Sequence, residues 1–301
     1  MDLIEKFGLI KVNATDRITA EDLRFCEVHQ AAYEAAIQTF KELSFLWNDA
    51  VKMQKELLQE VSQSIYDYLE YLTSSDGPRL SEDKISAHIF SLHTQFIHVI
   101  VHYFNATYHV SLSDEDVCAR VLPQKPRQDW LRDQSLITAY TDQMLSHIVC
   151  YQDVVDELIL QLEGQSFADR AFYELTQKCQ KAAWFLYPSR PRFNRKKRII
   201  SFTGHWCEFR QWGTYSRLTL SQGIQSILLG IAHFETGSYS QYPAGLSELL
   251  EHGDHRESTY DFPTCKKVCQ FKMFKNGRVD IKFASEAHAA KFEQDYLGLA
   301  C

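Results

Sequence analysis

The chain has 301 residues, of which 45% are hydrophobic and 24% are charged, and its formal net charge at pH 7 is −7. This composition is ordinary for a globular protein long enough for two domains, and it excludes a low-complexity protein. No stretch approaches the roughly 20 uncharged apolar residues of a membrane span, so we expect no membrane insertion.

The start of the chain lacks the basic residues and apolar run of a secretory signal. The eight cysteines are scattered, and several lie in apolar helical patterns, where a reduced thiol acts as a small hydrophobe. These features predict a cytoplasmic, thiol-reduced protein rather than a disulfide scaffold. No sequence feature indicates a cofactor.

The first predicted element is a long helix. No Gly or Pro occurs from Ala20 to Leu72, and apolar residues recur there at mostly three- to five-residue steps. Thr19 precedes this run as an N-cap, with Asp22 in the first turn. The pattern predicts one very long helix, or two helices with an unmarked break, as in a coiled-coil arm or a bundle.

Further helices are expected up to about residue 185. The run Thr73–Pro78 has the composition of a turn. The helices that follow are Ser81 to about Tyr103, a short one after Ser113, Gln128 to Glu163 with Gly164 closing it, and Ser166 to about Phe185. Together they predict an N-terminal bundle of antiparallel helices.

The pattern changes after Tyr187. The elements expected there are a strand, two helices, two paired strands and a last helix capped by Ser285: Arg198–Phe202, Thr219–Phe234, Pro243–Glu251, Val268–Phe274 with Arg278–Phe283, and Glu286–Leu297. The fold class is therefore predicted as α+β. A helical domain is expected over 1–187 and a small α+β domain with a terminal hairpin and helix over 188–301.

The two paired strands flank Lys275-Asn276-Gly277. Asn-Gly between two β-rich runs is the strongest short hairpin signal, because a type I′ turn needs positive φ at both central residues. We therefore expect a type I′ hairpin at this position.

This hairpin and the helix after it carry a resemblance. The segment Phe271–Phe283 with its following helix resembles the closing region of an uncharacterised domain of bacteria, phages and plasmids, often found beside or fused to DNA adenine methyltransferases. Tyr242–Leu246 is similar to that family's Pro-Gly segment, and Phe96–Tyr108 to its helix-to-loop exit. Arg278 stands where family members often carry Asn or Thr.

The resemblance implies a setting of mobile elements and DNA-modifying neighbours. The family has no established activity, so no catalytic residue carries over. The chain has neither a Gly-rich cofactor loop nor the acidic-Pro-Pro-aromatic motif of adenine methyltransferases, and so it is not itself a methyltransferase.

The strongest charge feature lies between Leu175 and Cys207, a window with no acidic residue. Since the chain is at −7, everything outside this window sums to −15. The window holds eight basic residues: Lys178, Lys181, Arg190, Arg192, Arg195, Lys196, Lys197 and Arg198. Such a segment on an acidic protein attracts phosphate or an acidic protein surface.

Aromatic residues interleave with these charges, and aromatic rings can stack on bases while Lys and Arg neutralise phosphates. We therefore predict nucleic-acid contacts from Lys181, Arg190, Arg192, Arg195, Lys196, Lys197 and Arg198. Two alternatives remain. The segment can be a solvated, semi-rigid connector, or it can contact the acidic N-terminal region in the same chain or in a second copy.

Two pairs have spacings that invite a metal. His98 and His102 share a helix face, but Val99 stands where a zinc protease needs Glu, so a polar helix face is the better interpretation. Cys265 and Cys269 would lie about 13 Å apart along a strand, at ~3.3 Å per residue. We predict no tightly bound zinc.

One group suggests catalysis. His205, Cys207 and Glu208 follow a strand, and a thiolate with a histidine base needs only those two groups in reach. Alternate residues on an extended chain share a face by default, so the grouping is weak and we assign no catalytic residue. The nearby aromatics Trp206, Phe209, Trp212 and Tyr215 are predicted to form a satellite core.

The sequence thus predicts a non-enzymatic binding protein of a mobile element, such as a defence or counter-defence factor. It would act on nucleic acid or on a nucleic-acid-handling protein complex. One alternative is a protein-only inhibitor or adaptor that forms oligomers through its long helices. Another is a hydrolase or nuclease that uses the region of His205, Cys207 and Glu208. The specific ligand and the oligomeric state are left open.

Overall fold

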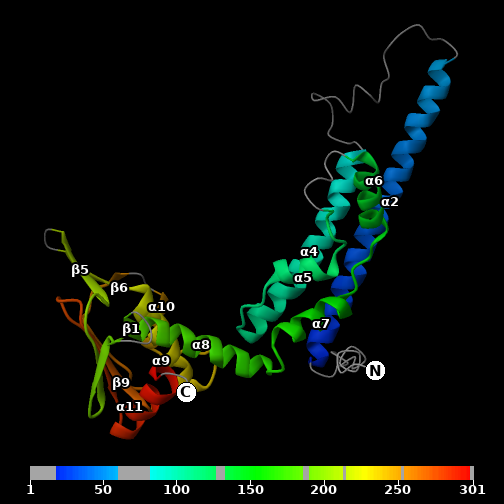
Figure 1. Cartoon of the computed structure of the whole chain (residues 1–301). Coiled ribbons are helices and arrows are strands. Elements are labelled where there is room, and N and C mark those ends of the chain that lie inside the picture. The colour runs from blue at the N-terminus through cyan, green and yellow to red at the C-terminus, as the bar shows by residue number, and fades with distance from the viewer. Residues whose placement is uncertain are drawn as a thin grey trace, which may run out of the picture. The chain divides into compact units, whose positions relative to one another are not determined.

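The computed structural model describes residues 18–59, 82–126, 133–185, 190–212, 215–251 and 254–298. The chain forms two compact units, Met1–Gln165 and Ser166–Cys301. The first is helical and the second combines helices with antiparallel strands, so the fold class is α+β, as predicted (Figure 1). Among the helices of the described residues, none is both long enough and apolar enough to cross a membrane.

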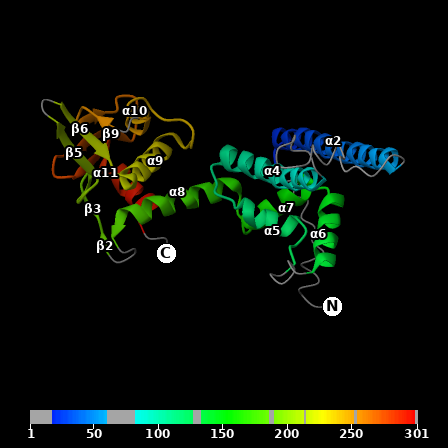
Figure 2. The ribbon, with the colours of Figure 1, turned by 90° about the horizontal axis from the view of Figure 1, so that it is seen from above.

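The N-terminal unit is built from helices that follow the predicted periodicity. Its two longest helices, α2 and α4, lie side by side (Figure 2). The described helices are α2 (Ala20–Gln59), α4 (Glu82–Tyr108), α5 (Asp114–Val121), α6 (Gln134–Ser146) and α7 (Tyr151–Gln161). The predicted turn over 73–78 and the end of the first predicted helix over 60–72 lie outside the described residues.

A chain of polar contacts runs through the core of this unit. Tyr33 of α2 stacks on Phe96 of α4 with 4.5 Å between ring centroids, and its hydroxyl lies 2.7 Å from His93 Nδ1. The other ring nitrogen of His93 lies 2.9 Å from the carbonyl oxygen of Met144. Burial lowers the pKa of His93, and a neutral ring that donates to Met144 and accepts from Tyr33 satisfies both nitrogens.

The predicted helix over 128–163 is wrong in one respect, because two helices occupy this region. The backbone turns between α6 and α7, at residues 147–150. Side chains of α2 bind that turn: the Gln30 amide donates to the Val149 carbonyl at 2.9 Å and accepts from the Tyr151 N–H at 2.9 Å. The Val149 N–H donates to the Tyr33 hydroxyl at 3.1 Å. These tertiary contacts satisfy backbone groups that a continuous helix would have paired.

Asp22 joins the start of α2 to the end of α4. Thr19 and Asp22 form a reciprocal cap, in which the Thr19 N–H donates to the Asp22 carboxylate at 2.8 Å and the Asp22 N–H donates to the Thr19 hydroxyl at 3.2 Å. The hydroxyls of Tyr103 and Tyr108 donate to the same carboxylate. Asp22 is 1% exposed, so this predicted N-terminal residue anchors a tertiary contact as well.

The C-terminal unit begins with helix α8 (Phe167–Ala183), which lies within the helix predicted from Ser166 and is capped by Ser166. A five-stranded antiparallel sheet has the strand order β3-β4-β10-β9-β8, and a smaller sheet has the order β5-β6-β7. The strands are β1 (Trp184–Phe185), β2 (Arg190–Pro191), β3 (Phe193–Lys196), β4 (Ile199–Phe202), β5 (Cys207–Trp212), β6 (Tyr215–Leu220), β7 (Asp254–His255), β8 (Thr259–Asp261), β9 (Val268–Met273) and β10 (Val279–Phe283). The helices are α9 (Gln222–Thr236), α10 (Leu246–Glu251), α11 (Glu286–Phe292) and the π-helix η3 (Glu293–Leu297).

Helix α8 belongs to this second unit. The boundary expected between 187 and 188 falls outside the described residues, and the chain instead divides between Gln165 and Ser166. Leu175, Cys179 and Ala183 of α8 are buried in the same core as the strands, and α8 packs on α9 and η3. An amphipathic helix joins the unit that covers its apolar face, and sequence periodicity does not say which unit that is.

The five-stranded sheet buries one face. Along β10, Val279, Ile281 and Phe283 are buried, whereas the alternate residues Asp280 and Lys282 are partly exposed. Helix α11, capped by Ser285 as predicted, packs on β10 and β4. The alternation is that of an antiparallel sheet with helices on one face and solvent on the other.

The predicted hairpin is present, but its turn is not type I′. The Gly277 N–H donates to the Phe274 carbonyl and the Phe274 N–H donates to the Arg278 carbonyl, both at 2.9 Å. Gly277 has φ of +83°, while Asn276 is not in the positive-φ region. This is a three-residue loop in which a type I turn is followed by a glycine bulge.

The hairpin over β5 and β6 was not predicted. Sequence reasoning began the following helix at Thr219, but Thr219 and Leu220 end β6, and Ser221 caps α9. Of the predicted satellite core, Trp206 is fully buried in the main core and Phe209 packs against that core. The side chains of Trp212 and Tyr215 lie outside the described residues. The three-residue spacing of the aromatics concealed the two-residue alternation of a strand.

Gly277 also joins the two sheets. Its carbonyl accepts hydrogen bonds from the backbone N–H groups of Trp206, at 2.9 Å, and Cys207, at 3.3 Å. A Cβ atom at this position would lie 2.6 Å from the carbonyl oxygen of Gly204. Only a residue without a side chain fits here, because backbone lies against it and its φ is positive.

We expect Gly277→Ala to destabilise the C-terminal unit by more than about 2 kcal/mol, through left-handed strain and the contact with Gly204 together. Gly237→Ala is a matched control, since Gly237 has φ of +71° and a Cβ there would meet nothing within 4 Å. The control should cost only the strain, about 1 kcal/mol. Urea unfolding of both variants measures the difference, and equal losses would contradict the close approach at Gly277.

Asp22 makes a pH-dependent contribution to stability. Burial acts to raise its pKa, but hydrogen bonds from Tyr108, Thr19 and Tyr103 outweigh burial and hold the pKa below its ordinary value of 3.8. A carboxyl group with a lowered pKa in the folded state stabilises the fold fully above its unfolded pKa. That contribution is lost as the pH falls through the folded pKa.

We therefore expect Asp22→Asn to lower the free energy of unfolding by about 2 kcal/mol at neutral pH. The difference from the unsubstituted protein should shrink as the pH falls below 3.8. Urea unfolding of the two proteins is compared from pH 7 to pH 3, because the contributions of the other carboxylates to the pH dependence are common to both and cancel in the difference. A difference that stays constant over the acid range would contradict the role of the Asp22 charge.

Candidate nucleic-acid interface

The cations of the basic window occupy several places in the C-terminal unit. Lys178 and Lys181 are exposed on α8. Arg190 lies in β2, which pairs with β1, and Arg192 follows it. Arg195, Lys196, Lys197 and Arg198 lie on β3 and the β3–β4 turn at the edge of the large sheet. The sequence run is therefore divided among a helix, two short strands and a hairpin.

Two of the predicted contact residues pack within the unit. The Arg192 guanidinium lies 4.3 Å from the ring centre of the buried Trp206. Arg195 forms an ion pair and hydrogen bond with the Glu293 carboxylate at the start of η3. These contacts occupy both guanidinium groups in the fold.

Five of the predicted contact residues are exposed: Lys181 on α8, Arg190 in β2, and Lys196, Lys197 and Arg198. Lys196, Lys197 and Arg198 form the tip of the β3–β4 hairpin, and all three are exposed. Lys197 has φ of +52°, and the Arg198 carbonyl accepts from the Phe283 N–H of β10 at 2.8 Å. Within the described part of the chain, none of these three cations forms an ion pair. The tip is thus held by backbone geometry while its charges face outward.

Two aromatic residues of the basic window, Trp184 and Phe193, do not accompany these cations, and the side chains of Phe185 and Tyr187 lie outside the described residues. The Trp184 indole N–H donates to the Leu297 carbonyl at 2.8 Å, and the Trp184 and Phe193 rings meet edge-on at 6.2 Å. Both rings pack against the core. The tip can therefore neutralise phosphates, but these two rings do not stack on bases as the sequence suggested.

A second cationic group was missed by sequence reasoning. A cavity of about 390 Å³ opens between the β5–β6 hairpin and the β8–β9 region. Its lining comprises Phe209, Arg217, Leu218, Arg256, Ser258, Lys272, Met273, Phe274 and Lys275. No sequence signal could have found it, since its four basic residues are spread along the chain and meet only through strand pairing.

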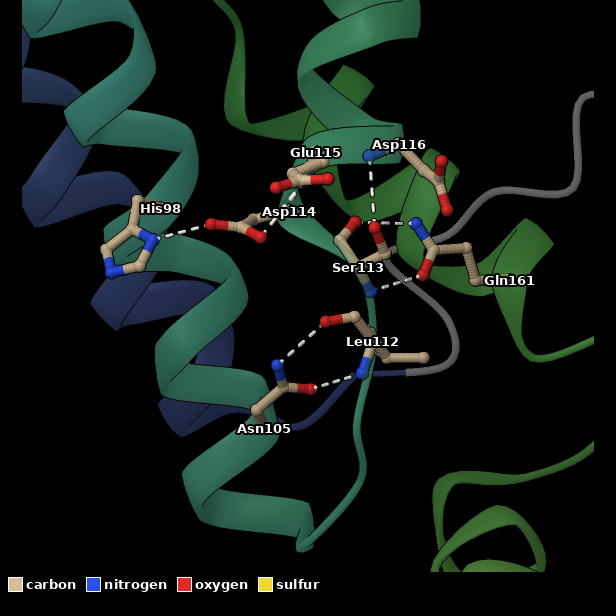
Figure 3. Close-up of polar contacts among 8 residues, drawn as sticks. All are labelled: His98, Asn105, Leu112, Ser113, Asp114, Glu115, Asp116 and Gln161. Atoms are coloured by element: carbon tan, nitrogen blue, oxygen red, sulfur yellow. Dashed lines mark hydrogen bonds and ion pairs between the residues drawn. The ribbon is translucent and has the colours of Figure 1, made fainter.

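The histidine pair on α4 has a carboxylate beside it, which sequence reasoning did not foresee. His98 Nδ1 lies 2.7 Å from Asp114 Oδ2 (Figure 3). The rings of His98 and His102 stack with centroids 6.1 Å apart. The hydrogen bond from His98 lowers the pKa of Asp114. Among the described residues, no three His, Cys, Asp or Glu side chains group closely enough to hold a metal ion.

The loop before α5 places Asp114. The Asn105 amide pairs with both backbone groups of Leu112, at 2.8 and 3.0 Å, and the Gln161 amide pairs with both backbone groups of Ser113, at 2.8 and 2.9 Å (Figure 3). Ser113 also caps α5 through the Asp116 N–H. The contact between His98 and Asp114 therefore closes an exposed helix–loop junction and fits the predicted polar helix face.

The segment from Cys265 to Cys269 is not a continuous extended strand. Cys265 lies before β9, and its N–H donates to the Phe262 carbonyl in a turn at 3.2 Å, so the strand distance estimated from sequence does not apply. Burial, followed by the charges of Glu235 and Cys269, raises the pKa of the Cys265 thiol to about 11. Such a thiol is protonated at neutral pH.

His205, Cys207 and Glu208 do not form a reactive group. Cys207 is buried and its thiol donates to the Phe274 carbonyl at 3.4 Å, and burial raises its pKa. Glu208 pairs with Arg210 at 2.9 Å, and His205 is exposed. A neutral thiol directed at a backbone carbonyl is a poor nucleophile.

No protein-family model matches the chain, and no curated protein or solved structure matches it.

Proposed function

We propose that the C-terminal unit binds nucleic acid, or a nucleic-acid-handling protein complex, without acting as an enzyme. The observation that carries this proposal is the β3–β4 tip, where Lys196, Lys197 and Arg198 are exposed together. The resemblance of the C-terminal hairpin to a domain of phages and plasmids supports a cytoplasmic role in a mobile element, such as defence or counter-defence.

Charge segregation supports this proposal. The basic window carries +8 in a chain whose remainder sums to −15. An acidic surface repels a polyanion, so such a ligand is drawn to the part of the molecule where cations are concentrated. Each phosphate contact also releases condensed counterions, which makes the affinity depend on salt.

We expect replacement of Lys196, Lys197 and Arg198 by Ala to weaken binding to a short DNA or RNA duplex. The slope of log affinity against log salt concentration should fall by about 2 to 3, because each lost phosphate contact removes roughly 0.7 to 0.9. Fluorescence anisotropy across a series of salt concentrations measures this slope.

A matched control removes three exposed cations elsewhere: Arg24, Lys52 and Lys125. It changes the net charge equally, and its salt slope should equal that of the unsubstituted protein. If the tip variant keeps the original slope, the three cations form a solvated strand edge and the nucleic-acid proposal is lost.

A second candidate function rests on α2. Leu46, Ala50, Met53 and Leu57 follow the alternating four- and three-residue spacing of a coiled-coil seam. Leu46, Met53 and Leu57 are 63%, 56% and 65% exposed. We infer that this seam pairs with the same seam of a second copy.

The flanking residues favour a parallel pair. Asp49 precedes the seam residue Ala50, and Gln54 follows the seam residue Met53. In a parallel pair, Asp49 of one copy would face Gln54 of the other, so that a carboxylate meets an amide. An antiparallel pair would set Asp49 and Glu56 against acidic residues of the other copy. Such a dimer fits the adaptor alternative that the long helices suggest.

We expect the chain to form dimers at micromolar concentration and Leu46→Glu with Met53→Glu to form monomers, because charges enter the seam. Phe45→Glu is the matched control: Phe45 is 72% exposed and lies beside the seam, so this variant should remain dimeric. Sedimentation equilibrium measures the mass. A monomeric parent chain would contradict self-pairing.

A further inference from the structure

The cavity between the two sheets differs from the β3–β4 tip in shape and composition. The tip is a convex turn, whereas the cavity encloses about 390 Å³, which lies within the range of small-ligand sites. Among the residues that the structure describes, Arg217, Arg256, Lys272 and Lys275 line it, and no acidic side chain does. The Ser258 hydroxyl adds a neutral donor to the same wall.

The nearest cross-strand acid is drawn away from the cavity. Lys272 of β9 stands opposite Asp280 of β10, where an ion pair between them would be expected. Asp280 instead pairs with Arg278, the residue just before β10, at 3.2 Å. The Lys272 charge therefore remains available to a ligand.

Aromatic rings position the lysines. Lys275 Nζ lies 4.7 Å from the ring centre of Phe209, and Lys272 Nζ lies 5.2 Å from that of Phe274. The Arg278 guanidinium lies 3.8 Å from the centre of the Phe274 ring. A cation over a ring face loses part of its rotamer freedom before the ligand arrives, which reduces the entropy lost on binding.

We propose that this cavity binds the terminal phosphate monoester of a nucleic-acid strand. This inference rests on the proposed nucleic-acid binding and names the part of the strand that is recognised. A terminal monoester carries about −1.5 to −2 at neutral pH, whereas each internal phosphodiester carries −1, so convergent cations favour the terminus.

The shape of the site agrees with that choice. One phosphate group with its nucleotide can enter a cavity of about 390 Å³. Guanidinium groups bind phosphate oxygens through two parallel hydrogen bonds, which Arg256 can supply from the segment between β7 and β8. The tip would hold the strand backbone, and the cavity would hold its end.

The test compares 12-nucleotide single strands that differ only at their ends: 5′-phosphate, 3′-phosphate, or hydroxyl at both ends. We expect the full chain to bind one phosphorylated strand at least about tenfold more tightly than the hydroxyl strand, since several charge-assisted hydrogen bonds form. Arg256→Ala with Lys272→Ala should remove this preference and leave the affinity for the hydroxyl strand within about twofold.

Two variants serve as controls. Lys282→Ala removes a cation from β10 that does not line the cavity, and it should keep the preference. Replacement of Lys196, Lys197 and Arg198 by Ala should weaken the binding of all three strands alike and also keep the preference for the phosphorylated strand. Thermal unfolding by circular dichroism confirms that each variant is folded.

The outcomes separate the two proposals. Hydroxyl and phosphorylated strands that bind equally would overturn the terminal-phosphate inference and leave nucleic-acid binding in place. A chain that binds none of the strands at low salt would overturn both. Competition with adenosine monophosphate and with inorganic phosphate distinguishes a strand end from a free phosphate compound as the ligand. If either competitor displaces the phosphorylated strand when both are present at equal concentration, the cavity selects free phosphate compounds and strand-end recognition is wrong.

Discussion

The C-terminal unit depends on the hydrogen bonds of one carbonyl group, that of Gly277. By accepting from the N–H groups of Trp206 and Cys207, it joins the hairpin of the large sheet to the first strand of the small one. Trp206 is fully buried, and Gly223 of α9 approaches its ring so closely that a Cβ would lie 3.1 Å away. The junction is therefore held by helices and strands together, and the cavity lined with cations lies between the two sheets that it joins.

The basic residues of this unit divide between two roles. Arg192 and Arg195 are used inside the fold, by the Trp206 ring and the Glu293 carboxylate, whereas the cations of the β3–β4 tip are exposed. Arginine suits the first role because its planar group can stack and pair at once. A run of like charges in sequence is thus divided between charges used inside the fold and charges exposed to solvent, and it is the fold that decides which charges remain available to a ligand.

The N-terminal unit is held by buried polar groups as well as by apolar packing. Asp22 joins two helix ends, and the contacts among Tyr33, His93 and Met144 join three helices. Every one of these polar atoms has a partner, which is the condition under which burial of polar groups favours one arrangement over others. The exposed apolar seam on the second half of α2 lies beyond these contacts.

The sequence by itself determined the elements whose signals are local. Helical periodicity, the helix starts near Ser113 and Ser166, the cap at Ser285, and the strand–Gly–strand hairpin at Gly277 all depend on residues close in the chain, and the structure confirms them. Only the tertiary structure decided the break between α6 and α7, the membership of α8 in the second unit, and the meeting of Arg217, Arg256 and Lys272. Each of these depends on contacts between segments far apart in sequence, such as the Gln30 amide at the Val149 carbonyl, and no local pattern records them.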